Sequence, residues 1–135
     1  MIRYLVDTDI ASYFLRQSFP ALNARMKAAM RQGEVALSAI TRAELRYGQS
    51  LMEAEDRRQT LIDLFLQEIP TLKWTGAAAD HYGRLAGILH KTGKPIGAMD
   101  TQIAAHALAE NLILITHNTR HYKRIAGLNI EDWTR

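Results

Sequence analysis

The chain contains no cysteine and only three prolines among its 135 residues. The absence of cysteine excludes disulfide bonds, thiolate zinc sites and cysteine nucleophiles, and it is typical of a reducing compartment. No apolar stretch approaches the roughly 20 residues that a membrane-spanning helix needs. The first residues also lack the pattern of a signal peptide, so we expect a cytoplasmic protein that does not associate with membranes.

What is present indicates one globular domain spanning residues 1–135. The hydrophobic fraction is 47% and the charged fraction is 23%, both ordinary for a folded domain. The length allows one core and is too short for two. The formal net charge of +3 and the sequence pI near 9.4 favour an anionic partner without requiring one.

Short apolar runs alternate with helical patterns along the chain. The expected strands are Ile2–Val6, Val35–Leu37, Leu72–Trp74, Leu112–Ile115 and a short one near Ile130. The expected helices cover residues 10–16, 20–33, 40–51, 54–67, 77–91 and 99–110, and a further short helix follows residue 116. This alternation predicts an α/β fold with a central parallel sheet of about four to five short strands flanked by helices. In such sheets, sites form at the carboxyl ends of the strands.

Asp7 directly follows the first expected strand and precedes a helix. A carboxylate in this place can cap the helix, as Thr8 could, or it can serve a site at the edge of the sheet. Asp9 can add a second carboxylate to the same place, or act as a first-turn acid favoured by the helix dipole. The residues alone leave both alternatives open.

Glu44 follows Thr41 at the spacing of a capping box, in which the glutamate bonds back to the backbone. The alternative is a role in a site, because Glu44 shares a helical stripe that we expect to face inward. The other members of this stripe are Ile40, Ala43, Tyr47 and Leu51. A glutamate on an inward face needs a partner or a metal, since burying an unpaired carboxylate is costly.

Asp100 is the third acid near the start of a helix. Ile103, Ala104 and Ala107 lie three, four and seven positions further on, so the carboxylate shares the apolar face. The alternative is a first-turn acid whose interaction with the helix dipole contributes under about 1 kcal/mol. Clustered carboxylates without cysteine ligands favour Mg²⁺ or Mn²⁺ over zinc.

Four segments, taken in this order, resemble the PIN-domain nucleases and more closely the VapC toxins of bacterial toxin–antitoxin pairs. The segments are Tyr4–Ile10; Ser38–Leu45 with Tyr47-Gly48; Asp100–Ala107 after Pro95-Ile96-Gly97; and Ile113–Arg120 with Gly127–Trp133. The resemblance covers nearly the whole chain and implies a single PIN-like domain. It implies that Asp7, Glu44 and Asp100 are the catalytic, metal-binding acids and that Thr116 helps to organise their site.

The segment after the last strongly apolar strand departs from the family pattern. Many members carry a further acid there, whereas the two candidate positions of this chain hold Asn118 and His121. Asn118 can still bind metal through its carbonyl oxygen, without charge, and Asp9 can compensate. The missing acid affects the expected binding of a second metal ion more than that of a first one.

The function that the resemblance implies is that of a type II toxin. Such a chain is an Mg²⁺- or Mn²⁺-dependent endoribonuclease that uses metal-activated water to cleave RNA, with tRNA as one candidate, and so inhibits translation. A VapB-like antitoxin and a homodimer are expected as well. The helices after Asp7 and Glu44 could dock the antitoxin, although Phe14, Tyr47 and Phe65 also suit a core. The candidate substrate-binding cations are Arg42, Arg46, Lys94 and Arg120.

Two other functions compete with this interpretation. Val6-Asp7-Thr8-Asp9 also matches the opening of haloacid-dehalogenase-like phosphatases, where Asp7 would be the nucleophile and Asp9 the acid/base. Those enzymes need a later pair of acids, and only Thr116-His117-Asn118 follows the last strongly apolar strand. The second competitor is a catalytically decayed domain that binds RNA or an antitoxin, supported only by the missing further acid.

Histidines are not needed for the proposed chemistry. His117 and His121 are four residues apart and could form a zinc pair if helical, but the sequence offers no third ligand for them. His106 lies within the helix that begins near Asp100, and we expect it to be a packed, hydrogen-bonded side chain.

Overall fold

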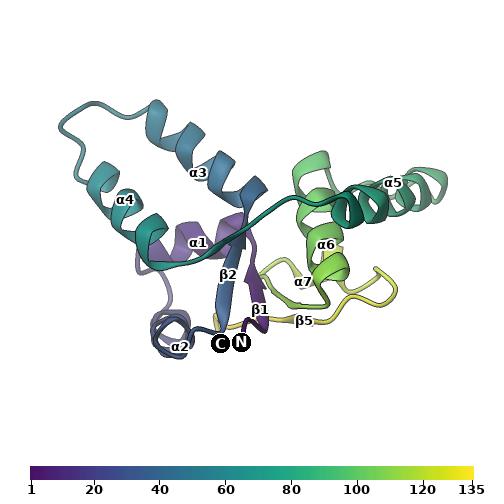
Figure 1. Ribbon diagram of the computed structural model, residues 1–135, viewed down its shortest axis with the longest axis horizontal. Coiled ribbons are helices and arrows are strands. Elements are labelled where there is room, and N and C mark those ends of the chain that lie inside the picture. The colour runs from purple at the N-terminus through teal and green to yellow at the C-terminus, as the bar shows by residue number, and fades with distance from the viewer.

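A computed structural model describes all 135 residues and confirms the predicted α/β fold (Figure 1). The strands are β1 (Tyr4–Val6), β2 (Val35–Ser38), β3 (Thr71–Leu72), β4 (Ile113–Ile115) and β5 (Ile130–Glu131). The helices are α1 (Thr8–Leu15), α2 (Pro20–Arg31), α3 (Ala39–Ser50), α4 (Arg58–Glu68), α5 (Gly76–Lys91), α6 (Ala98–Glu110) and α7 (Thr119–Tyr122). None of these helices combines the length and the apolar character that crossing a membrane would require.

The five strands form one sheet in the order β3-β2-β1-β4-β5, and every neighbouring pair is parallel. From β1 the chain builds outward to β2 and β3, and then returns to the other side of β1 to form β4. The strand order therefore reverses between β1 and β4. The Asp7 N–H extends the ladder past β1 by donating to the Ile115 carbonyl at 3.0 Å. Parallel sheets bind ligands outside the carboxyl ends of strands at such a reversal.

Helices cover both faces of the sheet. Strand side chains point alternately to the two faces, and the central strands β1 and β4 are apolar throughout, so both faces must be buried. Val6, Leu37 and Ile115 belong to the larger apolar core, which includes residues of α1, α2 and α4. Leu5 and Leu114 belong to a smaller core with residues of α5, α6 and α7. Figure 1 shows α1–α4 on one side of the sheet and α5 and α6 on the other. The carboxyl ends of β1 and β4 lie where these two layers meet.

Most element boundaries lie within one or two residues of the sequence prediction, and the start of α4 differs by four. α4 begins at Arg58 and not at 54, because the Asp56 carboxylate accepts the Arg58 N–H at 2.9 Å and the Gln59 amide donates to the Glu53 carbonyl at 2.9 Å. These side-chain bonds hold the preceding residues in turns. β3 ends at Leu72 and not at Trp74, because it pairs only with the last two residues of β2.

The predicted inward stripe of α3 is wrong. Tyr47 and Leu51 are 68% and 70% exposed, and Ala43 is exposed as well. The buried residues of this helix are Thr41 and Leu45. Apolar residues occur on two neighbouring stripes of α3. The helix packs on α1 and α4 with the stripe that contains Leu45, and the stripe that contains Tyr47 is exposed.

Candidate active site

Asp7 lies at the carboxyl end of β1 with 4% of its surface exposed. Its predicted capping role is confirmed, since Oδ1 accepts the Ile10 N–H at 2.8 Å and Asp7 is the N-cap of α1. The Thr116 hydroxyl, just beyond the end of β4, lies beside this carboxylate. Burial raises the pKa of Asp7 to about 7, although the hydrogen bonds from Thr116 and Ile10 act in the opposite direction. Capping and a role in the site are therefore compatible in this residue.

Asp100 lies in the first turn of α6 and is half-buried. The prediction that it shares the apolar helix face is confirmed, because Ile103, Ala104 and Ala107 are fully buried. Burial raises the pKa of Asp100, while the Tyr122 hydroxyl beside it lowers the value and the charge of Asp9 raises it further.

Asp9 completes this group of acids. It is exposed on the first turn of α1, and its negative charge raises the pKa of both Asp7 and Asp100. We call these three residues the carboxylate mouth. Their mutual repulsion, in a place that is partly withdrawn from water, is a favourable setting for a cation.

Glu44 is held beside the carboxylate mouth by a threonine. The predicted capping box is wrong, because Ser38 caps α3 by accepting the Ile40 N–H at 3.0 Å and Thr41 is buried within the helix. The Thr8 hydroxyl donates to Glu44 Oε1 at 2.6 Å and lies 3.1 Å from Thr41 Oγ1. Glu44 thus reaches the residue next to Asp7, but its charge is not among those that shift the pKa of Asp7 or Asp100.

Thr116 organises the strand end next to Asp7. It is fully buried, lies close enough to Asp7 to lower the pKa of that carboxyl, and accepts the Asn118 N–H at 3.0 Å. The Asn118 amide nitrogen lies 2.8 Å from His121 Nδ1, so this amide is engaged by the histidine. His121 also lies close enough to Asp100 to lower its pKa. A metal-binding role for Asn118 stays a prediction.

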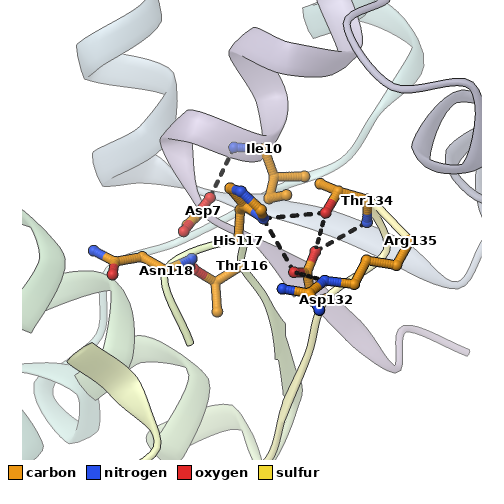
Figure 2. Close-up of polar contacts among 8 residues, drawn as sticks. All are labelled: Asp7, Ile10, Thr116, His117, Asn118, Asp132, Thr134 and Arg135. Carbon is orange, nitrogen blue, oxygen red and sulfur yellow. Dashed lines mark hydrogen bonds and ion pairs between the residues drawn. The ribbon is translucent and has the colours of Figure 1, made fainter. Parts of the chain in front are cut away.

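His117 joins the same segment to the C-terminal residues, as Figure 2 shows. Its Nδ1 lies 3.0 Å from Asp132 Oδ2 and 3.1 Å from the Thr134 hydroxyl, which donates to Asp132 Oδ1 at 2.6 Å. Arg135 Nε lies 3.6 Å from the same carboxylate. Burial alone would raise the pKa of Asp132, but the hydrogen bonds from Thr134 and His117 lower it overall. This network fixes the loop that carries Thr116.

His106 has the packed, hydrogen-bonded role that the sequence predicted. It is fully buried, its Nδ1 lies 2.8 Å from Ser38 Oγ, and Trp74 packs against its ring edge-on. Burial lowers the pKa of His106, which favours the neutral ring. Because Ser38 ends β2 and His106 lies on α6, this pair fixes the helix of Asp100 to the sheet.

The donors of the carboxylate mouth suit a hydrated cation more than a fully dehydrated one. No group of three or more histidine, aspartate or glutamate side chains is arranged closely enough to hold a metal ion. Mg²⁺ needs no such cage, since it commonly binds through one or two carboxylates and keeps several waters. Asp7 and Asp100 provide oxygen ligands of this kind, and the binding of one ion by Asp7, Glu44 and Asp100 together stays a prediction.

The four predicted substrate-binding cations fall into two pairs. Arg42 donates to the Thr71 hydroxyl at 3.0 Å and Arg46 to Asp63 at 2.6 Å, so both make contacts within the chain. Lys94 and Arg120 are exposed and form no ion pair. Of the four, these two are the cations available to an anionic ligand.

Two features were missed from the sequence. The first is Tyr122, whose buried hydroxyl faces Asp100; a lone tyrosine in a short polar helix gave no signal. The second is a groove between α1, α3 and α4. It is lined by Thr8, Ser12, Leu15, Arg16, Glu44, Leu45, Gly48, Met52, Arg58, Leu61 and Ile62. Of the aromatic residues considered for docking, Phe65 is in the core, Phe14 packs against it, and Tyr47 is on the surface.

Known proteins share both the sequence and the fold. Residues 4–128 match the PIN domain. A Shigella flexneri protein named tRNA(fMet)-specific endonuclease VapC is 34% identical, covering 99% of this chain and 100% of that protein. Two solved complexes also match. In VapBC2 from Rickettsia felis bound to a promoter DNA fragment, the matching chain is 32% identical over 98% of this chain and 99% of that chain, with a TM-score of 0.88. In VapBC-1 from nontypeable Haemophilus influenzae, the matching chain is 34% identical over all of both chains, with a TM-score of 0.86. The geometry of the sheet edge and these likenesses agree: the chain belongs to the PIN-domain family of nucleases, in its VapC branch.

Proposed function

We propose that this chain is the toxin of a type II toxin–antitoxin pair and cleaves RNA at the carboxylate mouth with the help of Mg²⁺ or Mn²⁺. The observation that carries the proposal is the buried Asp7 at the reversal of strand order, with its pKa raised to about 7 and Asp100 beside it. Relatives named as ribonucleases support RNA as the substrate. The family match gives no support to the phosphatase alternative, in which Asp7 would be a nucleophile.

In the proposed reaction, Asp7 and Asp100 would hold the cation, and Thr116 would keep the Asp7 carboxylate in place. When bound, the cation polarises the attacking water and neutralises charge on the scissile phosphate. As a ligand, Asp7 would be in its ionised form, because metal-binding carboxylates must be ionised. Glu44, fixed by Thr8, would help to orient the attacking water. Lys94 and Arg120 contact phosphates of the RNA outside the mouth.

The direct test is cleavage of defined RNAs by the purified chain. Because one relative is named for its action on tRNA(fMet), initiator tRNA is the first substrate to compare with an elongator tRNA and an unstructured RNA. We expect cleavage with Mg²⁺ or Mn²⁺, none with a chelator, and new 5′-phosphate ends at one position. Cleavage that persists in excess chelator would contradict the metal-dependent mechanism. RNA binding without any cleavage would favour the decayed domain.

The partner we propose is a VapB-like antitoxin with a segment lying in the groove between α1, α3 and α4. The groove offers apolar contacts from Leu15, Leu45 and Leu61 and reaches Glu44 beside the carboxylate mouth. Leu61 is 49% exposed there, whereas Ile88 on α5 is 58% exposed outside the groove. Leu61→Glu should abolish co-purification with the co-expressed antitoxin, and Ile88→Glu should not. Equal binding by both variants would contradict this docking site.

We further propose that the chain acts in the cytoplasm, where its RNA substrates are, and that it forms a homodimer. Both proposals rest on the resemblance to VapC toxins. Light scattering on the purified chain should give twice the monomer mass, and a monomer mass at micromolar concentration would contradict the dimer.

A further inference from the structure

Tyr122 has a buried hydroxyl group without a hydrogen-bond partner. The residue ends α7 and is 1% exposed, and no protein atom satisfies its hydroxyl oxygen. Buried polar atoms of this kind are rare in folded proteins, because leaving one unsatisfied costs about 1–3 kcal/mol. The other two unsatisfied side-chain atoms, Asn23 Oδ1 and His106 Nε2, belong to residues outside the carboxylate mouth.

The unsatisfied hydroxyl lies close to the carboxylate mouth. Among the carboxylates, Asp100 acts on this hydroxyl most strongly, although the two groups do not meet hydrogen-bond geometry, and the charges of Asp7 and Asp9 act on it as well. Burial and these three negative charges raise the pKa of Tyr122 far above its ordinary value. A tyrosine hydroxyl is protonated at physiological pH and is therefore available as a hydrogen-bond donor.

The rest of the side chain is fixed by the smaller core. The Tyr122 ring belongs to the apolar cluster that includes Leu5, Ile103 and Leu114. Because the ring is held by both the sheet and α6, the hydroxyl has a defined position relative to Asp100. An orphan donor held rigidly beside a half-buried acid is a suitable second layer for a bound cation.

We infer that Tyr122 is a positioning residue of the carboxylate mouth, whose hydroxyl donates a hydrogen bond to the Asp100 carboxylate once a hydrated divalent cation is bound there. This inference rests on the proposed metal-dependent function. Ionised Asp100 would accept this hydrogen bond while it serves as a ligand of the cation. The hydrogen bond orients the ligand and satisfies the hydroxyl in the same step.

The test removes only the hydroxyl and measures cation affinity. Tyr122→Phe should bind Mn²⁺ about tenfold more weakly than wild type, measured by calorimetry or by the electron paramagnetic resonance signal of free Mn²⁺. Its melting temperature without cation should be unchanged or higher, because an unsatisfied buried group has been removed. The matched control is Tyr4→Phe: Tyr4 is 7% exposed, begins β1 at its other end, and packs edge-on against Trp133. This control should bind Mn²⁺ like wild type.

Three results would overturn the inference. Wild-type Mn²⁺ affinity in Tyr122→Phe would show that the hydroxyl does not position a ligand. An equal loss in Tyr4→Phe, or a loss accompanied by a lower melting temperature without cation, would show a general packing effect. A wild-type chain that binds no Mn²⁺ at all would overturn the metal-dependent function as well, which distinguishes that failure from the first two.

Discussion

The two sides of the site hold their acids by different means. Where β1 and β4 end beside α6, the buried Asp7 and the half-buried Asp100 are withdrawn from water, and burial raises the pKa of both. On the side of α1 and α3, Glu44 is half-buried and is fixed by a 2.6 Å hydrogen bond from Thr8. The first arrangement creates unfavourable charge that a cation relieves, whereas the second fixes one side chain in place. We therefore expect cation affinity to depend on the first side and alignment of the substrate on the second.

The largest effect should follow from removing the charge of Asp100. Asp100→Asn keeps the size of the side chain and should lower RNA cleavage about a thousandfold, because cation-based charge stabilisation contributes several kcal/mol to the reaction. The control is Asp80→Asn, a change of the same kind at an exposed position of α5, which should cleave like wild type. Cleavage by Asp100→Asn within threefold of wild type would contradict a role for the Asp100 charge in binding the cation.

Removing the charge of Asp7 should stabilise the protein while it inactivates the site. The pKa of Asp7 in the folded state is about 7, above its unfolded value, so the folded chain binds the proton more tightly. Without a cation, stability should therefore fall as pH rises from about 4 to above 7. Asp7→Asn should lack this fall and unfold at a higher temperature at pH 8, by up to about 4 kcal/mol in free energy of unfolding. Asn can also cap α1.

The control for this measurement has the opposite sign. The pKa of Asp132 is lowered in the folded state, so its ionised form stabilises the fold and Asp132→Asn should unfold at a lower temperature at neutral pH. Chemical or thermal unfolding in a chelator, followed from pH 4 to pH 8, measures both variants. If the free energy of unfolding depended on pH in the same way in wild type and Asp7→Asn, the raised pKa of Asp7 would be contradicted.

Glu44→Gln sharpens the comparison from the other side. Cleavage should fall by about ten- to a hundredfold, because Gln can still accept the Thr8 hydrogen bond but lacks the charge of Glu44, while Mn²⁺ affinity stays within about twofold of wild type. Glu55→Gln, at an exposed position in the turn before α4, serves as the control. If Glu44→Gln weakened Mn²⁺ binding as much as Asp100→Asn does, both sides of the site would contribute to cation affinity, and the proposed division between them would be wrong.

The smallest effect should come from the turn that starts α6. Gly97 precedes this helix with φ +98°, a backbone conformation that side chains with a Cβ rarely adopt. Gly97→Ala should lower the free energy of unfolding by about 1–2 kcal/mol and weaken Mn²⁺ binding slightly, because Asp100 follows three residues later. Gly87→Ala, in the middle of α5 with open space around its Cβ, should instead be neutral or stabilising by up to about 1 kcal/mol. Equal melting temperatures for the two variants would contradict this.

Much of the fold and part of the site were predictable, for reasons that differ between residues. Apolar runs flanked by turn residues located β1 and β4, and with them Asp7 and Thr116 at neighbouring strand ends. Spacing on α6 located Asp100 correctly because one face of that helix is rich in alanine and fully buried. On α3, two neighbouring stripes both contain apolar residues, so periodicity could not decide which one packs, and Tyr47 was placed inward wrongly.

Tyr122 shows what a single sequence cannot supply. Its burial comes from residues of β1, α6 and β4 that lie far away along the chain. The polar residues around it in the sequence indicate an exposed helix. Its role depends on which way one hydroxyl points, and that direction is decided only when the distant elements pack together.

The pairing of β1 with β4 affects when the site can form during synthesis of the chain. Tyr4 faces Ile113 across this ladder, so the two strands that carry Asp7 and Thr116 are separated by more than a hundred residues of chain. Contacts between distant segments form late, since a long loop must close first. We expect a newly synthesised chain to fold α1–α4 early and to stay without a competent site until β4 has been translated and inserted beside β1. During that delay an antitoxin can bind the growing toxin before it becomes able to cut RNA.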